Sequence, residues 1–385
     1  MSENTEIRRQ FAQAKQVVVK IGSRVLVQRD GRPDLRRLRA LVKDLAALRQ
    51  AGREVVVVSS GAIGAGMSVL GLKKRPAHLP DLQMAAAVGQ SRLMALYDQL
   101  FAEQKCRVGQ VLLTHADLKD RQRHLNARNT MMNLLRHGIV PIVNENDVVA
   151  VDEIRFGDND VLASLVALLI QADLLVLLTT VDGFREPVAA GRTRRVPFLK
   201  GVNDEALALA VGKGSELSTG GMMSKLLAAD TVAGVGTPVV IANGRQSGTI
   251  RRILEGEDVG TLLAGGKTAG LSGRKRWIAF FHKAKGTLVV DDGARLAIME
   301  KGKSLLPIGI RAVEGEFEAG DVVNIRTAGG EVFARCVTHY AGGAVRRIQG
   351  RKTADIAAVL GFSEFEEVIH RDNMVVLRGQ QGGTL

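Results

Sequence analysis

The sequence predicts an α/β protein with an open, mainly parallel β-sheet sandwiched by helices, followed by a small β-rich domain. Three observations lead to this prediction. Apolar, β-branched runs alternate with helical patterns over about 250 residues, which is typical of strands buried on both faces of a parallel sheet. A Gly-rich and then basic stretch interrupts this alternation after Gly265. Beyond it the apolar runs are shorter, turns separate them, and few long helices are predicted.

Each element of the first domain follows from its periodicity. Asp34 is a suitable N-cap for the first long helix and Gly52 a suitable stop. Strand–helix alternation of this kind indicates right-handed crossovers. The predicted strands are 16–22, 54–61, 108–113, 138–144, 173–180 and 237–244. The predicted helices are 34–52, 81–104, 125–137, 161–172, 203–211 and 223–233.

Length and composition indicate two domains. A single core rarely exceeds roughly 250–300 residues, and this chain has 385. We predict a first domain at 1–265, a linker at 266–276 and a β-rich domain at 277–385. Strands of the last domain are expected within GTLVVDDGA, AGDVVNIRTAGGEVFARCVTH and NMVVLRG.

Cysteine usage and apolar stretches indicate a cytoplasmic protein. Cys106 and Cys336 are the only cysteines, so no disulfide framework is expected and a reducing compartment is favoured. The N-terminal residues lack the apolar core of a secretory signal. The longest apolar stretch, 161–181, is interrupted by Gln171 and Asp173, so a helix running into a strand is predicted there instead of a membrane span.

The net charge of +13 is located mostly in the first two thirds of the chain. Such an excess attracts anionic ligands or nucleic acid, but scattered surface arginine is the commoner explanation. Residues 277–385 hold nearly equal numbers of basic and acidic residues. This balance does not favour RNA binding by the C-terminal domain, which stays open because Arg346-Arg347 and Arg351-Lys352 form a local basic cluster.

Loops at the ends of the predicted strands are the candidate binding site, because open parallel sheets bind ligands beyond the carboxyl ends of their strands. SSGAIGAG at 59–66, TTVDG at 179–183 and STGGMMSK at 218–225 are rich in Gly or small hydroxyl residues. Such loops let backbone N–H groups approach a phosphate at the positive end of the following helix. One such loop alone is weak evidence, because many are only tight turns.

Two lysines strengthen the hypothesis of a phosphate site. Lys20 lies in a strand otherwise made of Val and Ile, where an unpaired lysine is costly, so it is expected to face a ligand or an acid. Lys225 lies at a helix start, where the dipole disfavours a cation unless an anion shares the site. The alternatives are a Lys20 that snorkels to solvent and a Lys225 that is merely solvated.

No standard motif for nucleotides or metals accompanies these lysines. GGKTAG at 265–270 imitates the end of a P-loop, but the glycine required at 261 is Thr261. The seven histidines show no metal-binding spacing, and no Ser–His–Asp set is identifiable. No protein ligand of a metal ion is predicted.

Acids and amides gather in two stretches, IVPIVNENDVVA at 139–150 and IRFGDNDVLASLVALLIQA at 154–172. Turn chemistry alone, with Asp158 or Asp160 capping the next helix, explains only one or two of them. A calcium loop would need a regular spacing and a distal Glu that are absent. The residues concerned are Asn144, Glu145, Asn146, Asp147, Asp158, Asn159 and Asp160.

A cradle for an amino-acid substrate explains these residues better. An Asn amide both donates and accepts, so Asn144 or Asn159 suits a carboxylate and an ammonium group. Asp147 or Asp158 is suited to pair with an ammonium, and one Asp near two lysines would position both for a phosphoryl group. A carboxylate acceptor is already ionised at pH 7, so no general base is needed and the lack of a catalytic His is understandable.

Seven motifs resemble the amino-acid kinase family, in its order along the chain. They are VVVKIGS, SSGAIGAG, AAVGQSRL, NENDVVA, FGDNDVLASL, STGGMMSK and RKRW. The C-terminal GTLVVDDGARLAI, KSLLPIGI and GDVVNI resemble a PUA domain, a small β-barrel-like module best known in RNA-modifying proteins. The resemblance extends from about residue 16 to residue 380.

The resemblance implies ATP-dependent phosphorylation of the side-chain carboxylate of L-glutamate, the first step of proline synthesis. It further implies Mg²⁺ with ATP, feedback inhibition by proline and a homo-oligomer. Its implied phosphate contacts are Lys20 and Lys225, oriented by Asp160. Its implied glutamate-binding residues are Ser60, Asp147 and Asn159, with Asn144 and Asp158 nearby. The residues implied to bind ATP are Lys20, Thr179, Thr180, Thr219, Gly220, Gly221, Met222, Met223, Ser224 and Lys225.

One departure from the family pattern and two alternatives remain open. The family often has Asp where this chain has Thr180, which puts the role of that position in nucleotide or metal contact in doubt. The chain is alternatively another member of the family, acting on acetylglutamate, aspartate or UMP. The second alternative is an RNA-binding protein that acts through its C-terminal domain.

Overall fold

The computed structural model describes residues 2–27, 33–149, 159–188, 192–210, 221–264, 284–361 and 365–377. The chain forms two compact units, Met1–Ala269 and Gly270–Leu385. The linker predicted at 266–276 lies outside the described residues, so the proposed domain boundaries stay a prediction. No helix in the described ranges is long and apolar enough to cross a membrane, and Cys106 and Cys336 are buried, free thiols.

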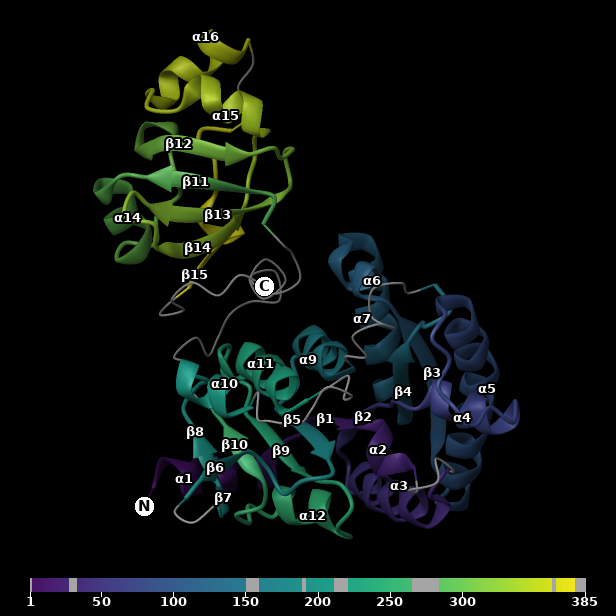
Figure 1. Ribbon diagram of the computed structural model, residues 1–385. Helices are drawn as coiled ribbons and strands as arrows, with labels where there is room; N and C mark the ends of the chain where they lie inside the picture. Colours follow the sequence, from purple (N-terminus) through teal and green to yellow (C-terminus); the bar gives the residue numbers. More distant parts are fainter. Residues whose placement is uncertain are drawn as a thin grey trace. The chain divides into compact units, whose positions relative to one another are not determined.

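An eight-stranded sheet forms the centre of the first unit, in the order β3-β4-β2-β1-β5-β9-β10-β8 (Figure 1). Its pairings are parallel except that of β9 with β10. The predicted open, mainly parallel sheet is confirmed. The strands are β1 (Gln16–Ile21), β2 (Glu54–Val58), β3 (Arg107–Leu113), β4 (Ile139–Glu145), β5 (Leu174–Thr179), β8 (Phe198–Leu199), β9 (Val239–Asn243) and β10 (Thr261–Leu263).

Helices cover both faces of this sheet (Figure 1). On one face α9 packs against β1 and β5, and α11 packs against α9 and β9; on the other, α3 packs against β2 and α12 against β9. A separate hairpin is formed by β6 (Arg185–Pro187) and β7 (Thr193–Arg195). The helices of the first unit are α1 (Glu3–Gln10), α2 (Ser23–Leu26), α3 (Leu35–Gln50), α4 (Ala62–Val69), α5 (Leu79–Glu103), α6 (His115–Lys119), α7 (Arg121–Arg136), α9 (Asn159–Ile170), α10 (Asp204–Ala210), α11 (Met222–Ala233) and α12 (Thr249–Leu254).

The alternation of β1 explains why a lysine is placed in a buried strand. Val17, Val19 and Ile21 belong to the apolar core that includes side chains of α3, α5 and α12. Because successive side chains of a strand point to opposite faces, Lys20 points to the face covered by α9. Strand β1 is hydrogen-bonded to β2 and β5 on its two sides. The ammonium group of Lys20 is therefore brought to the side of the sheet where α9 begins.

Two glycines allow α4 and α5 to pack with their backbones in contact. A Cβ added at Gly66 would overlap the carbonyl of Ala85, and one added at Gly89 would overlap the carbonyl of Ala62. The loop before α4 turns at Gly61, whose φ of 102° lies in the left-handed region that favours glycine. This contact determines where α5 lies relative to the loop at the end of β2.

Substitution of Gly89 by Ala is expected to destabilise the first unit. The added methyl group meets backbone atoms that cannot move aside alone, and overpacking of this kind costs about 1–3 kcal/mol or more. Urea unfolding of the full chain measures the loss. Gly64→Ala on α4 is the matched control, because a Cβ there has nothing within 4 Å. Since Ala is the better helix former, an equal loss in both variants would contradict the packing explanation.

The second unit is a five-stranded sheet in the order β12-β11-β13-β14-β15. The strands β11 and β13 are parallel and the other neighbours antiparallel. The β-rich character predicted for this part of the chain is confirmed, although β12 was not predicted. The elements are β11 (Gly286–Val290), α14 (Asp292–Met299), β12 (Ile310–Gly315), β13 (Val322–Thr327), β14 (Val332–Val337), α15 (Gly342–Ile348), α16 (Ile356–Leu360) and β15 (Met374–Val376).

Candidate active site

The carboxyl ends of the parallel strands bring the predicted site residues to one edge of the sheet. Lys20 lies near the end of β1, Ser60 follows β2, and Asn144 lies near the end of β4. Helix α9 starts at Asn159 and Asp160, and α11 starts after Gly221, which is its N-cap. The order β4-β2-β1-β5 explains why residues far apart in sequence meet here.

Asp160 bridges the two lysines. Its Oδ1 lies 2.6 Å from Nζ of Lys20 and its Oδ2 lies 2.8 Å from Nζ of Lys225. The hydroxyl of Ser224 donates a weaker hydrogen bond of 3.4 Å to the same Oδ2. Relative exposures are 5% for Lys20, 1% for Asp160 and 6% for Lys225. The lysines come from a strand and a helix, and their spacing is determined by one carboxylate.

The electrostatics of this cluster favour an anionic ligand. Burial alone would raise the pKa of the Asp160 carboxyl, but the positive charges of Lys20 and Lys225 and their hydrogen bonds hold it below its usual value. Two ammonium groups and one ionised carboxylate therefore meet in a buried place. Lysine is a usual binder of phosphate, and a cationic donor kept away from water acts more strongly on developing negative charge. The geometry is therefore suited to a phosphoryl group.

Asparagine side chains form a second cluster beside the lysines. Nδ2 of Asn159 donates to the carbonyl of Ser59 at 2.6 Å, to Oγ of Ser60 at 3.0 Å and to Oδ1 of Asn144 at 2.9 Å. Because Asn159 and Asp160 are adjacent at the start of α9, the amide cluster and the lysine cluster are linked directly. Both carboxylate oxygens of Asp160 face lysines, so capping of the helix alone does not account for this residue.

Helix α5 supplies two supporting residues that the sequence did not single out. Nδ2 of Asn144 donates to Oε1 of Gln90 at 2.8 Å. The hydroxyls of Ser59 and Tyr97 lie 2.9 Å apart, and burial raises the pKa of Tyr97 to about 12. Gln90 lies within AAVGQSRL, a motif that was recognised in the sequence. A helical pattern does not show, however, that the side chain of Gln90 contacts a residue at the end of β4.

The remaining residues of the NEND stretch follow Asn144 at the end of β4. Glu145 is buried, and its Oε1 lies 3.8 Å from Nδ1 of His115. Asp147 is partly buried in the turn after β4, which places it near the same strand end as Asn144. Asp158 lies outside the described residues, so its predicted role stays a prediction.

Apart from Lys20 on β1, the described residues predicted to bind ATP lie at the end of β5 and at the start of α11. Thr179 ends β5 and pairs with Asn243 of β9, and Thr180 follows it, both partly buried. Gly221 caps α11, and its first turn consists of Met222, Met223, Ser224 and Lys225. Thr219 and Gly220 lie outside the part of the chain that the structure describes.

Asp182, two positions after Thr180, forms an ion pair with Arg185. Its carboxylate is held by NH1 of Arg185, at 2.8 Å from Oδ1 and 2.7 Å from Oδ2. The pair is about half exposed. No group of three His, Cys, Asp or Glu residues within the described ranges is arranged to hold a metal ion.

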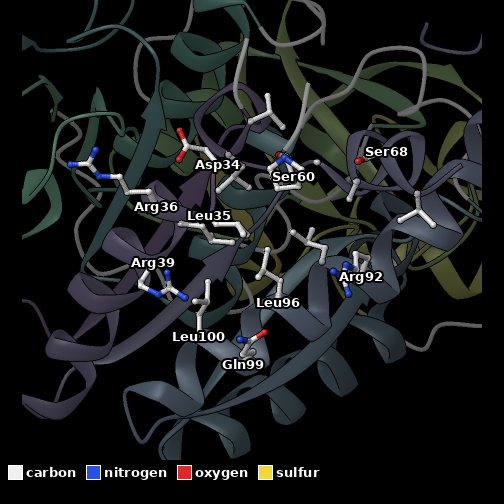
Figure 2. A pocket seen from close by; sticks show the side chains of 18 residues that line it. Asp34, Leu35, Arg36, Arg39, Ser60, Ser68, Arg92, Leu96, Gln99 and Leu100 are labelled. Atoms are coloured by element: carbon white, nitrogen blue, oxygen red, sulfur yellow. The ribbon is translucent and has the colours of Figure 1, made fainter. Parts of the chain in front are cut away.

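A cavity of about 610 Å³ lies between the β2–α4 segment, α2, α3 and α5 (Figure 2). Ser60 and Gly61 line one side of it, and Arg36, Arg39 and Arg92 carry charge at its walls. Neither lysine of the buried cluster lines this cavity, and Asp160 does not either. The cavity is therefore lined by Ser60 of the amide cluster but not by the three residues of the lysine cluster.

Comparison with known proteins identifies the family. Residues 15–243 match the profile of the amino acid kinase family, and residues 286–360 match that of the PUA domain. The chain belongs to the amino acid kinase family. The region matched by the kinase profile contains both lysines, the Asp160 that bridges them, and the amide cluster. The predicted PUA-like character of the second unit is confirmed.

Curated relatives of this amino acid kinase extend over nearly the whole chain. A glutamate 5-kinase of Moorella thermoacetica is 47% identical over 374 residues, covering 97% of this chain and 99% of that protein. Glutamate 5-kinases of Pelobacter propionicus and Myxococcus xanthus are 44% and 46% identical, covering 96% and 98% of this chain and 100% of each relative. The aligned regions include both units of this chain.

Proposed function

We propose that this chain is a glutamate 5-kinase, which transfers the γ-phosphoryl group of ATP to the side-chain carboxylate of L-glutamate. The observation that carries the proposal is the bridge of Lys20, Asp160 and Lys225 next to the amide cluster of Asn159. One cluster suits a transferring phosphoryl group and the other an amino acid. Their adjacency at the start of α9 supports binding of the two substrates side by side, and relatives of similar length carry this name.

The lysine pair stabilises the charge that develops on the transferring group. Phosphoryl transfer depends mainly on positioning and electrostatic stabilisation, with little covalent work for the protein. Lys20 approaches from β1 and Lys225 from α11, and Asp160 keeps both ammonium groups oriented. The attacking carboxylate of glutamate is ionised at neutral pH, so no side chain has to remove a proton.

The amide cluster holds the amino-acid end of glutamate. Asn159, Asn144 and Ser60 provide donors and acceptors for its carboxylate and ammonium groups, and Asp147 pairs with the ammonium. Asp158 belongs to the same proposed set. Two segments line the phosphates and the base of the nucleotide. They are Thr179-Thr180 and the segment from Thr219 to Lys225, which contains Gly220, Gly221, Met222, Met223 and Ser224.

Mg²⁺ would reach this site with ATP. Both carboxylate oxygens of Asp160 face ammonium groups, and the described residues contain no cluster of metal ligands. This donor set fits an ion coordinated mainly by phosphate oxygens and water, which is how Mg²⁺ is usually bound beside a nucleotide. When bound, the ion neutralises charge on the phosphates of ATP.

The resemblance to this branch of the family also supports a place at the first step of proline synthesis, with proline as a feedback inhibitor. A homo-oligomeric state and a cytoplasmic location belong to the same proposal. Inhibition by proline is tested directly by adding it to the turnover assay at a fixed, subsaturating concentration of glutamate.

ADP release, coupled to a second enzyme, tests the proposed function. The full chain with ATP and Mg²⁺ is offered glutamate, acetylglutamate, aspartate or UMP, one at a time. We expect turnover with glutamate at a kcat/KM at least about a hundredfold above that with the others, because buried polar groups reject a substrate that leaves them unpaired. Turnover with another of the four and none with glutamate would refute the assignment.

Substitution of the amide cluster is expected to separate the two substrates. Asn159→Ala and Asp147→Ala should raise the KM for glutamate about tenfold or more and leave the KM for ATP within about twofold, because each removes contacts to one substrate only. Steady-state kinetics with each substrate varied in turn measures both constants. Equal rises in both KM values would indicate a loosened helix α9 in place of a substrate contact.

A further inference from the structure

A chain of amide hydrogen bonds leads from α5 into the amino-acid end of the site. Oε1 of Gln90 accepts from Nδ2 of Asn144 at 2.8 Å, and Oδ1 of Asn144 accepts from Nδ2 of Asn159 at 2.9 Å. This series of hydrogen bonds ends at Asn159, whose Nδ2 also donates to the carbonyl of Ser59 and to Oγ of Ser60. Every side chain in it is at least partly buried.

The donors and acceptors of this series of amide hydrogen bonds can be arranged in only one direction. An amide nitrogen only donates and an amide oxygen only accepts. The backbone carbonyl of Ser59 is an acceptor, so it requires Nδ2 of Asn159 on its side. Asn144 must then turn Oδ1 toward Asn159 and Nδ2 toward Gln90. If Gln90 were flipped, two NH₂ groups would face each other and one buried donor would lose its partner.

The direction decides which atom Asn159 presents to the substrate. The three acceptors that the structure describes around the Asn159 side chain all face Nδ2 and share its two N–H groups. Its Oδ1 is therefore turned away from the chain, as an acceptor. An acceptor suits the ammonium group of an amino acid and repels a carboxylate.

Gln90 is held in place by the helix packing described above. It follows Gly89, whose contact with the backbone of α4 leaves no space for a side chain. Its Nε2 is buried and has no hydrogen-bond partner in the described part of the chain. A buried donor without a hydrogen bond is unfavourable. The hydrogen bond that Oε1 accepts from Asn144 is therefore what determines the orientation of the Gln90 amide.

We propose that Gln90 is a positioning residue for the amino-acid substrate: it accepts from Asn144 and so maintains the amide direction that turns Oδ1 of Asn159 toward the substrate's ammonium group. This inference rests on the proposed function, because it assumes that an amino acid occupies the amide cluster. Gln90 acts through Asn144 and Asn159 and has no role in the transfer of the phosphoryl group.

Two variants of similar length test the proposal. Gln90→Met keeps the size of the side chain and its helix propensity but removes the acceptor, whereas Gln90→Glu keeps an acceptor and removes the NH₂ group. We expect Gln90→Met to raise the KM for glutamate about tenfold, which corresponds to about 1.4 kcal/mol. The KM for ATP should stay within about twofold and kcat within about threefold, because ground-state contacts to one substrate are affected. Gln90→Glu should restore most of the lost affinity.

Gln99→Met is the matched control, because Gln99 lies on the same helix with its side chain exposed. It should leave both KM values unchanged. Thermal unfolding of all variants is recorded in parallel, since a purely structural role would lower the Tm of Gln90→Met and raise both KM values together. That result would overturn the proposal, as would a Gln90→Met variant with the wild-type KM for glutamate.

Equal losses in Gln90→Met and Gln90→Glu would also overturn it, because the important atom would then be Nε2. The wild-type chain separates this inference from the proposed function. If it does not turn over glutamate but does turn over another substrate of the panel, the proposed function fails. The same comparison of variants, made with that substrate, then still decides whether Gln90 positions the amide chain.

Discussion

Lys20→Ala and Lys225→Ala are each expected to lower kcat by about 10²–10³, the scale for losing one donor that stabilises a transition state. Each ammonium group lies within 2.8 Å of the same carboxylate. Removing one leaves a single ammonium group beside Asp160, so one of the two proposed donors to the phosphoryl group is lost. Saturating turnover with glutamate and ATP measures the effect.

The exposed Lys43 of α3 provides the control. Lys43→Ala removes a positive charge from a helix on the opposite face of the sheet from α9. Its kcat should remain within about twofold of the wild type, because exposed charges are screened. If both cluster variants keep a near-normal kcat, the two lysines are not the groups that stabilise the transferring phosphoryl group, and the proposed mechanism is wrong.

Asp160→Asn is expected to lower the free energy of unfolding by about 3–5 kcal/mol, because removing one partner leaves buried charges uncompensated. Two ammonium groups would then repel each other across a neutral amide. Urea unfolding at pH 7 measures the loss. Asp182→Asn is the control, because Asp182 forms an exposed pair with Arg185, and such pairs contribute only about 0–1 kcal/mol.

The same variant predicts the pH dependence of stability. The pKa of Asp160 is lowered in the folded protein, so its stabilising contribution is fully present above the unfolded value of about 3.9. The contribution is lost as the pH falls through the lower folded pKa. The difference between wild type and Asp160→Asn should be constant from about pH 5 to 7 and shrink below about pH 4. A difference that shrinks on raising the pH would contradict this sign.

Much of the kinase unit was predictable because local pattern and burial agree there. Runs such as 54–61 and 173–180 are continuous and β-branched, as strands covered on both faces must be, and they correspond to β2 and β5. Short elements were harder. Strand β12 has a mixed pattern of buried and exposed residues, and α4 begins within a Gly-rich stretch that reads equally well as a loop.

The candidate site was predictable in its parts and not in its contacts. Lys20 stood out because a lysine in an apolar strand needs a partner, but no periodicity could show that Asp160 also reaches Lys225, 65 positions further along the chain. Gln90 and Tyr97 were not singled out, because their positions on α5 look like any other turn of an amphipathic helix. Asp158, Thr219 and Gly220 lie outside the described residues and stay predictions.

The sequence by itself determined the alternation of strands and helices, the change to a β-rich unit, and the residue types that suit a phosphate and an amino acid. These features depend on local periodicity and on the cost of burying a charge, and both can be read along the chain. Only the tertiary structure decided which carboxylate bridges the lysines and in which direction the amide chain runs. Those contacts depend on the order of β4, β2, β1 and β5 in the sheet and on the close packing of α4 and α5 at two glycines. Hydrogen bonds between residues far apart in the sequence require particular positions in space, and sequence spacing does not determine those positions.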